Sequence, residues 1–140
     1  MSIGTEPLGE IRETTITISE TWLDMFGHVN NAAYLTLFEQ VRWDIVSPMG
    51  FGVKGIQEKQ MGPTILEVKL QFRREIRARD TIKVKTFVTN HSGKITHLRQ
   101  IMVKENGEEA CIADFVLALF DLKARKLIEP TEEWKRALGM

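Results

Sequence analysis

The chain has 140 residues, and its 19 basic and 19 acidic side chains give a formal net charge of zero. This length is typical of one domain and short for two, so we expect a single domain over residues 1–140. The balanced charge disfavours a protein that coats nucleic acid, and the longest apolar stretch, residues 112–120, is too short to span a membrane.

The expected location in the cell follows from the cysteine content and from the first residues. Cys111 is the one cysteine of the sequence, which excludes an intramolecular disulfide and suits a reducing compartment. Residues 1–10 are polar and lack the apolar centre of a signal peptide. We therefore expect a cytoplasmic protein.

The first part of the chain predicts one strand and one long helix. Isoleucines alternate with polar residues over 11–19, where three threonines favour a strand. Apolar residues over 32–46 recur at helical spacing, and Asn31 is the expected N-cap. Further apolar residues on the other sides of this helix indicate burial on most sides. Ser47-Pro48 is expected to end it.

The rest of the chain predicts four strands, over 64–73, 82–88, 95–104 and 109–122. In the first of them, apolar and charged residues alternate, so that Leu66, Val68 and Phe72 share one face. Short hairpins would arrange the four strands as an antiparallel meander. The fold class is therefore α+β, with an antiparallel sheet curled around one central helix.

Shorter signals complete the expected architecture. Asn106-Gly107 is typical of a type I′ hairpin turn between the last two predicted strands. Residues 53–60 can form a short helix, and Trp134 lies in a C-terminal helix that is expected to begin near Thr131.

The segment just before the long helix carries the residues with most chemical interest. Asp24 and His28 place a carboxylate and an imidazole close to the helix N-terminus, where free backbone N–H groups gather. Such an end suits the stabilisation of an oxyanion that develops on a carbonyl. Gly27 permits a tight turn between the two residues. These ingredients favour acyl transfer, although Asp24 can also be a simple cap and His28 a structural hydrogen-bonding residue.

Three helix residues are further candidates. Tyr34 and Phe38 are more typical of a core than of a ligand site. Glu39 lies within a mostly apolar helix, so we expect its carboxylate to be paired or functional.

The pattern of this segment resembles the signature of hot-dog-fold thioesterases of the 4-hydroxybenzoyl-coenzyme A thioesterase family. The similarity rests on the run DMFGHVNNAAY from Asp24 to Tyr34, followed by Phe38-Glu39 and by Arg42. The resemblance implies a hot-dog fold, in which a sheet of about five to six strands wraps around one long helix. It also implies an acyl-CoA thioesterase that hydrolyses a fatty or an aromatic acyl thioester.

The resemblance also implies roles for individual residues. Asp24 matches the catalytic carboxylate, which acts as a nucleophile or as a general base for water. The Asn31 backbone N–H matches the group that polarises the thioester carbonyl, and Gly27 and His28 belong to the same motif. Tyr34 matches a residue that lines the site. A helix carboxylate is catalytic in another branch of the fold, which makes Glu39 a second candidate base.

The substrate and assembly are likewise implied by the resemblance. Coenzyme A would be part of the substrate rather than a cofactor, and an acyl carrier protein is an alternative carrier. We select Arg73, Arg74 and Lys94 from a basic stretch as candidates for contact with the coenzyme phosphates. No metal site is expected, because Cys111 and the three histidines lack ligand spacing. A homodimer, often paired into a homotetramer, would place the substrate at the subunit interface.

Two other functions stay open at this point. Hot-dog hydratases and dehydratases pair an acid with a histidine, and Asp24 with His28 offers such a pair, but the spacing differs and the Asn-Pro of that pattern is absent. A non-catalytic acyl-ligand-binding module would need Asp24 only as a cap. Binding of nucleic acid through the basic stretch is disfavoured, because its charges alternate with apolar positions and lack interleaved aromatic residues.

Overall fold

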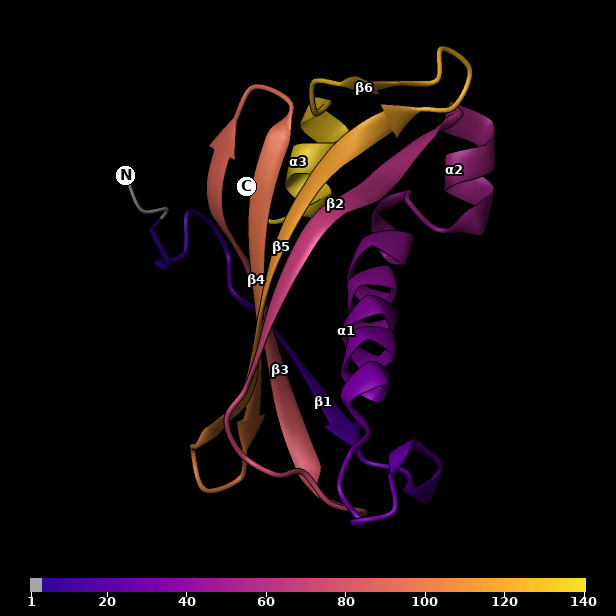
Figure 1. Cartoon of the computed structure of the whole chain (residues 1–140). Coiled ribbons are helices and arrows are strands. Elements are labelled where there is room, and N and C mark those ends of the chain that lie inside the picture. Colours follow the sequence, from indigo (N-terminus) through magenta and orange to yellow (C-terminus); the bar gives the residue numbers. More distant parts are fainter. Residues whose placement is uncertain (1–3) are drawn as a thin grey trace.

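The structure is a computed structural model that describes residues 4–140, and Figure 1 shows the arrangement of its helices and strands. The first three residues of the N-terminal stretch, where we expect no signal peptide, lie outside the described residues. The strands are β1 (Arg12–Thr17), β2 (Met61–Phe72), β3 (Thr81–Ser92), β4 (Ile95–Lys104), β5 (Glu109–Asp121) and β6 (Lys126–Ile128). The helices are α1 (Asn31–Val46), α2 (Val53–Lys59) and α3 (Glu132–Ala137), with 3-10 turns η1 (Glu20–Trp22) and η2 (Ser47–Met49).

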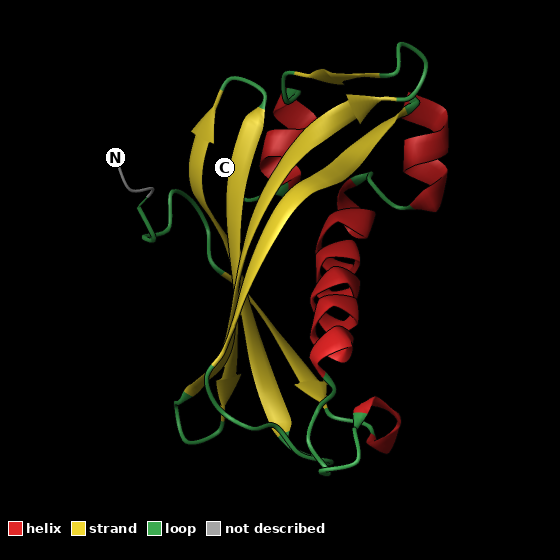
Figure 2. Ribbon diagram, viewed as in Figure 1, coloured by secondary structure: helices red, strands yellow, loops and turns green. Residues whose placement is uncertain are grey.

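The strands form one antiparallel sheet in the order β1-β3-β4-β5-β2, and β6 pairs with the end of β5. Figure 2 shows this strongly twisted sheet with α1 running along one side of it. The expected meander is wrong in one respect, because β2 pairs with β5 and not with the strand that follows it. The connection over residues 73–80 is long enough to carry the chain across the sheet, so a tight hairpin does not constrain β2.

Helix α1 begins one residue earlier than expected. The side chain of Asn30, not that of Asn31, caps the helix and accepts the Ala32 N–H at 2.8 Å. Asn31 is therefore the first helical residue rather than the cap, which leaves its backbone N–H at the open end of the helix.

The predicted burial of α1 on most sides is also wrong. One face packs into the core through residues such as Leu37 and Phe38, which are 2% and 0% exposed. The stripe Leu35, Glu39 and Trp43, spaced four residues apart, remains exposed. Apolar residues on the outer side of this helix therefore remain uncovered by residues 4–140.

Strand β2 is an edge strand whose central part is exposed on both faces. Ile65, Leu66 and Val68 are 40 to 44% exposed, and Phe72 is 53% exposed. The register with β5 shifts between Ile65 and Glu67, which breaks the strict alternation of the strand. The described part of the chain thus leaves the face shared by Leu66, Val68 and Phe72 uncovered.

A hairpin turn does form at Asn106-Gly107, as expected. Its type is not I′, because type I′ requires positive φ at both central residues. Gly107 has φ of 88°, whereas Asn106 is not among the residues with positive φ. Gly107 N donates to Lys104 O, and Lys104 N donates to Glu108 O. This is a type I turn followed by a left-handed glycine, a common connection in three-residue hairpins.

The core lies between α1 and the sheet and is closed at the upper end in Figure 1 by α3. Trp134 on α3 is 2% exposed and stacks edge-on against Phe51, with ring centroids 4.8 Å apart. Thr131 caps this helix as expected. Within residues 4–140, no helix has the length and apolar composition needed to cross a bilayer.

Candidate active site

The segment that carries Asp24 folds into a tight loop before α1. Asp24 N donates to His28 O at 2.8 Å, and Gly27 N donates to Asp24 O at 3.1 Å. Gly27 has φ of 78°, a left-handed conformation that a residue with a side chain would adopt only with strain. The loop tip, Met25 and Phe26, is 98% and 79% exposed. The chain thus returns on itself and brings residue 28 beside residue 24.

The Asp24 carboxylate is oriented by its own loop. Its Oδ1 atom accepts the backbone N–H groups of Phe26 at 2.9 Å and His28 at 3.4 Å. Oδ2 forms no hydrogen bond to any residue of the described chain, so one carboxylate oxygen is free to meet a ligand. The side chain is exposed rather than buried.

The N-terminus of α1 offers a free donor in the same region. The Asn30 side chain takes the Ala32 N–H, and the Asn30 carbonyl takes the Ala33 N–H. The Asn31 N–H is left without an acceptor among residues 4–140. A free N–H at the positive end of a 16-residue helix is the kind of donor that stabilises a developing oxyanion.

Asp24 and Asn31 line one open cleft of about 540 Å³. His28, Tyr34, Arg73 and Arg74 also lie along it, together with two residues that the sequence did not indicate, Phe72 and Glu75. The structure therefore brings together most of the predicted site residues, from two segments about 40 positions apart in the sequence.

Tyr34 forms part of the cleft wall. Its ring packs edge-on against Phe72, with centroids 5.1 Å apart, and the residue is 4% exposed. Burial raises the pKa of Tyr34 to about 12, and the nearby Cys111 and Asp24 add to the increase. The hydroxyl therefore stays protonated at neutral pH and can donate a hydrogen bond.

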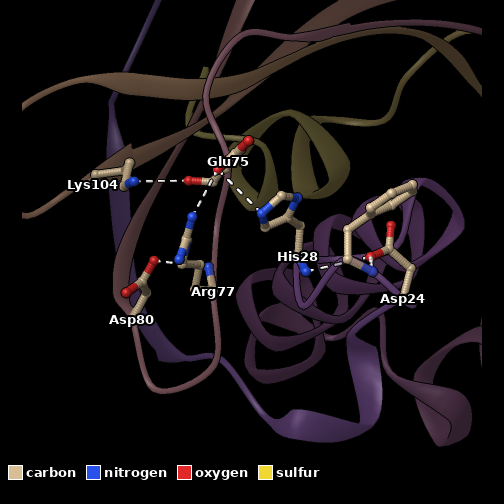
Figure 3. A network of polar contacts seen from close by, with 7 residues as sticks. Asp24, His28, Glu75, Arg77, Asp80 and Lys104 are labelled. Atoms are coloured by element: carbon tan, nitrogen blue, oxygen red, sulfur yellow. Dashed lines mark hydrogen bonds and ion pairs between the residues drawn. The ribbon is translucent and has the colours of Figure 1, made fainter.

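The imidazole of His28 points away from Asp24 and towards the connection between β2 and β3 (Figure 3). Its Nε2 atom lies 3.2 Å from Glu75, which also pairs with Arg77 at 3.2 Å. Val29 N donates to Ile76 O, so backbone and side chains together attach the Asp24 loop to this connection. Asp24 and His28 do not form an acid–imidazole pair.

The two arginines of the cleft differ in their pairing. The Arg74 Nε atom lies 2.5 Å from Glu108, and this contact holds the pKa of the Glu108 carboxyl below its usual value. Arg73 donates to the neutral side chain of Gln71 at 3.1 Å and forms no ion pair within the described chain. Arg73 is thus the less neutralised cation at the cleft.

The remaining predicted site residues lie elsewhere. Phe38 is 0% exposed and packs against Phe115, so it belongs to the core. Glu39 accepts a hydrogen bond from the Trp43 Nε1 atom at 3.2 Å and lines a second cavity. Lys94 is in the hairpin between β3 and β4, at the opposite end of the sheet from Phe72, as the strand register shows.

The sequence carried weak signals for the two cleft residues that were missed. Phe72 ends a strand whose alternation made it look like any other apolar strand residue. Glu75 is one of two acids in a stretch of ten basic residues from Lys69 to Lys104, which could have marked it as a partner for one of them. No group of three His, Cys, Asp or Glu residues in the described chain is arranged to hold a metal ion.

Comparison with known proteins supplies the family. A family model described as the thioesterase-like superfamily matches residues 19–138. The chain belongs to this superfamily. The membership confirms the resemblance drawn from the Asp24–Tyr34 motif and the expected enzyme class, a thioester hydrolase.

Individual members of the superfamily agree with this placement. The long-chain acyl-CoA thioesterase FadM of Escherichia coli K12 is 24% identical over 127 residues, which cover 90% of this chain and 96% of FadM. A Staphylococcus aureus protein in complex with CoA has a TM-score of 0.84 at 18% identity, covering 95% of this chain and 84% of its own. The DHNA-CoA thioesterase of S. aureus has a TM-score of 0.78 at 22% identity, covering 91% and 87%. These likenesses confirm the hot-dog fold.

Proposed function

We propose that this thioesterase hydrolyses acyl-CoA thioesters in the cleft between the Asp24 loop and the N-terminus of α1. The observation that carries the proposal is that Asp24, with its free Oδ2 atom, and Asn31, with its free backbone N–H, line the same cleft. The first can act as a nucleophile or activate water, and the second can donate a hydrogen bond to the carbonyl oxygen as it becomes negatively charged.

The reaction has two possible first steps at Asp24. In one, a carboxylate oxygen attacks the thioester carbon, the C–S bond breaks, and CoA leaves as a thiolate while a mixed anhydride forms; water then hydrolyses the anhydride. In the other, the carboxylate takes a proton from water, which attacks the same carbon. Both routes end with a carboxylic acid and the CoA thiol, and the Asn31 N–H stabilises the oxyanion in each.

The other cleft residues have supporting roles in this proposal. The Tyr34 hydroxyl is a protonated donor at the cleft wall, and Arg73 is a cation available to a phosphate of the coenzyme. The carrier of the acyl group, free CoA or an acyl carrier protein, would meet the same open cleft. We place the enzyme in the cytoplasm.

The hydratase alternative is less well supported. That reading assigns the acid and the histidine to Asp24 and His28, and the His28 ring contacts Glu75 rather than Asp24. Release of free thiol from an acyl-CoA, measured beside the loss of enoyl absorbance, separates the two reactions.

The decisive test is Asp24→Asn, which keeps the Oδ1 acceptor for the loop and removes the charge. We expect kcat to fall by two or more orders of magnitude, on the order of the loss of a catalytic group. Asp44→Asn, an exposed helix aspartate that does not line the cleft, is the matched control and keeps the wild-type rate. An Asp24→Asn protein that is folded and fully active would overturn the proposal. Rapid-quench mass spectrometry distinguishes the routes, since only the nucleophilic one adds an acyl group to the chain.

We also propose that two copies pair through β2. This 12-residue edge strand leaves apolar groups and backbone hydrogen-bonding groups uncovered, and an antiparallel second copy satisfies both. Glu67 and Lys69 flank Val68, so a two-fold pairing centred on Val68 sets opposite charges against each other across the edge. Two such dimers would make a tetramer.

A further inference from the structure

A second cavity, of about 190 Å³, lies between the C-terminal half of α1, the start of β2 and α3. Its deep wall is apolar and includes Leu98, Leu117 and Trp134, each 2% exposed. Its exposed lining residues, Glu39, Trp43 and Ile65, mark the mouth. An apolar chamber with few polar groups is the usual form of a small-molecule subsite.

Arg42 is the unexpected member of this lining. It is partly buried, and its guanidinium lies 4.2 Å from the centre of the Phe115 ring. Burial lowers the pKa of Arg42 to about 10, against an opposing contribution from the charge of Glu39, so it remains a cation at neutral pH. A cation that is largely removed from water normally has a carboxylate partner, and the partly buried Arg42 forms no ion pair with any residue from 4 to 140.

The hydrogen bonds around Arg42 show that its position is fixed but its charge is not neutralised. One N–H donates to Gln100 Oε1 at 3.0 Å, a neutral acceptor. The Gln100 amide nitrogen is fully used, donating to Phe38 O at 3.2 Å and to Thr86 Oγ1 at 3.1 Å. The other guanidinium N–H groups have no acceptor in the described chain. Trp134 Nε1, on the same wall, is a buried donor without a partner among residues 4–140.

The position of Arg42 relative to the cleft indicates how long an acyl chain must be to reach it. Gln100 links the Arg42 guanidinium to the Phe38 carbonyl, so the guanidinium lies alongside α1 between residues 38 and 42. That is seven to eleven residues beyond Asn31, or roughly 10 to 16 Å along the helix at about 1.5 Å per residue. An extended acyl chain of roughly eight to thirteen bonds covers this distance at ~1.2 Å per bond.

We propose that Arg42 is a specificity-determining residue, and that the cavity takes the remote end of an acyl group that carries a carboxylate there. The inference rests on the proposed thioesterase function and names its substrate class: a medium-length acyl-CoA with a terminal oxygen anion. The free guanidinium N–H groups supply charge-assisted hydrogen bonds, while the apolar wall accommodates the methylene chain. A methyl-terminated acyl group would leave the cation unpaired in the cavity.

The test compares three thioesters of equal length: decanoyl-CoA, its ω-hydroxy derivative and sebacoyl-CoA, which ends in a carboxylate. For the wild-type enzyme we expect kcat/KM for sebacoyl-CoA to exceed that for decanoyl-CoA by about tenfold, mostly through KM, with the hydroxy compound between them. In Arg42→Met the ratio should fall below one, since the carboxylate then enters an apolar cavity without a partner. Arg42→Lys, which keeps the charge, should recover part of the preference.

The matched control is Arg125→Met, which removes another arginine that lies over a phenylalanine ring, Phe120, at 5.1 Å. This variant should keep the wild-type ratio. A wild-type enzyme that hydrolyses decanoyl-CoA at least as well as sebacoyl-CoA overturns the inference and leaves the proposed function intact. A wild-type enzyme that hydrolyses none of the three, nor any aromatic acyl-CoA, overturns the proposed function itself. Thermal stabilisation by free sebacate above that by decanoate would support the inference without any variant.

Discussion

The imidazole of His28 lies 3.2 Å from the carboxylate of Glu75, and this contact joins the Asp24 loop to the connection between β2 and β3. The loop has an exposed tip and is otherwise attached by backbone contacts such as Val29 N to Ile76 O. The side-chain contact thereby helps to fix the distance between Asp24 and the start of α1. Glu75 is in this sense a positioning residue rather than a catalytic one.

Glu75→Gln should weaken the hold on the Asp24 loop. We expect a decrease of kcat by a few-fold with little change in KM, because the ligand contacts remain while the carboxylate samples more positions. The loss of stability should be within about 1 kcal/mol, since the pair is partly exposed. The matched control, Glu13→Gln, removes an ion pair with Lys83, neither of which lines the cleft, and should leave kcat as it is. Steady-state kinetics and urea unfolding measure both quantities, and an equal kcat for the two variants contradicts the positioning role.

Loss of the cap at Asn30 should affect both stability and rate. Asn30→Ala removes the acceptor of the Ala32 N–H and should cost about 1 kcal/mol of unfolding free energy. Fraying of the first turn also moves the Asn31 N–H, so kcat should decrease. Asn30→Ser, which retains a capping oxygen, should restore most of both properties. If Asn30→Ala lowers the melting temperature while kcat is unchanged, the helix end is not part of the reaction.

The raised pKa of Tyr34 makes stability depend on pH in the alkaline range. The phenol of the folded protein has a pKa of about 12, whereas the unfolded chain releases this proton near the ordinary tyrosine pKa of 10.0. The contribution is therefore complete below pH 10 and is lost as the pH rises from 10 towards 12. Cys111, whose pKa burial raises from 9.0 to about 12, acts in the same direction from pH 9 upwards.

Tyr34→Phe isolates the tyrosine contribution because it keeps the ring against Phe72. Between neutral pH and about pH 11, the wild-type protein should lose roughly 1 kcal/mol more unfolding free energy than the variant. Urea unfolding at the two pH values gives the difference. Parallel pH dependence of the two proteins would mean that the hydroxyl ionises as freely in the folded chain as in the unfolded one.

The proposed dimer predicts a specific effect at Val68. Val68→Lys places two like charges at the centre of the β2 pairing and should convert the dimer to a monomer, as measured by light scattering after gel filtration. Activity should fall with it, if the second copy closes the substrate site. Thr15→Lys, on the β1 edge at the opposite side of the sheet, is the control and should stay dimeric. If the molar mass of the Val68→Lys protein in solution equals that of the wild-type dimer, the β2 interface is excluded.

The sequence predicted α1 and β5 well because each is specified locally. Helical spacing of apolar residues over 32–46 and a nearly continuous apolar run over 109–122 leave little choice of element. The partner of β2 was not predictable in the same way. Its apolar pattern fits beside any apolar strand, and an eight-residue connection does not select β3 over β5.

The same distinction explains the site. Asp24, Asn31 and Tyr34 lie within eleven residues of one another, so their proximity followed from the motif and the start of the helix. Phe72, at the end of β2, and Glu75, just after it, also line the cleft. Their position there depends on the pairing of β2 with β5, which the sequence did not indicate. Lys94 is a candidate through its charge and its expected place near a hairpin loop, and neither property tells which end of the sheet that loop occupies.

The position of β5 in the sheet has a consequence for local opening of the molecule. Its backbone bonds to β4 and β6 on one side and to β2 on the other, so its amide groups have partners along nearly the whole strand. Opening it requires the two halves of the sheet to separate, whereas the edge strand β1 can detach from a single neighbour, β3. Amide protons of β5 should therefore exchange with deuterium last, and only through global unfolding.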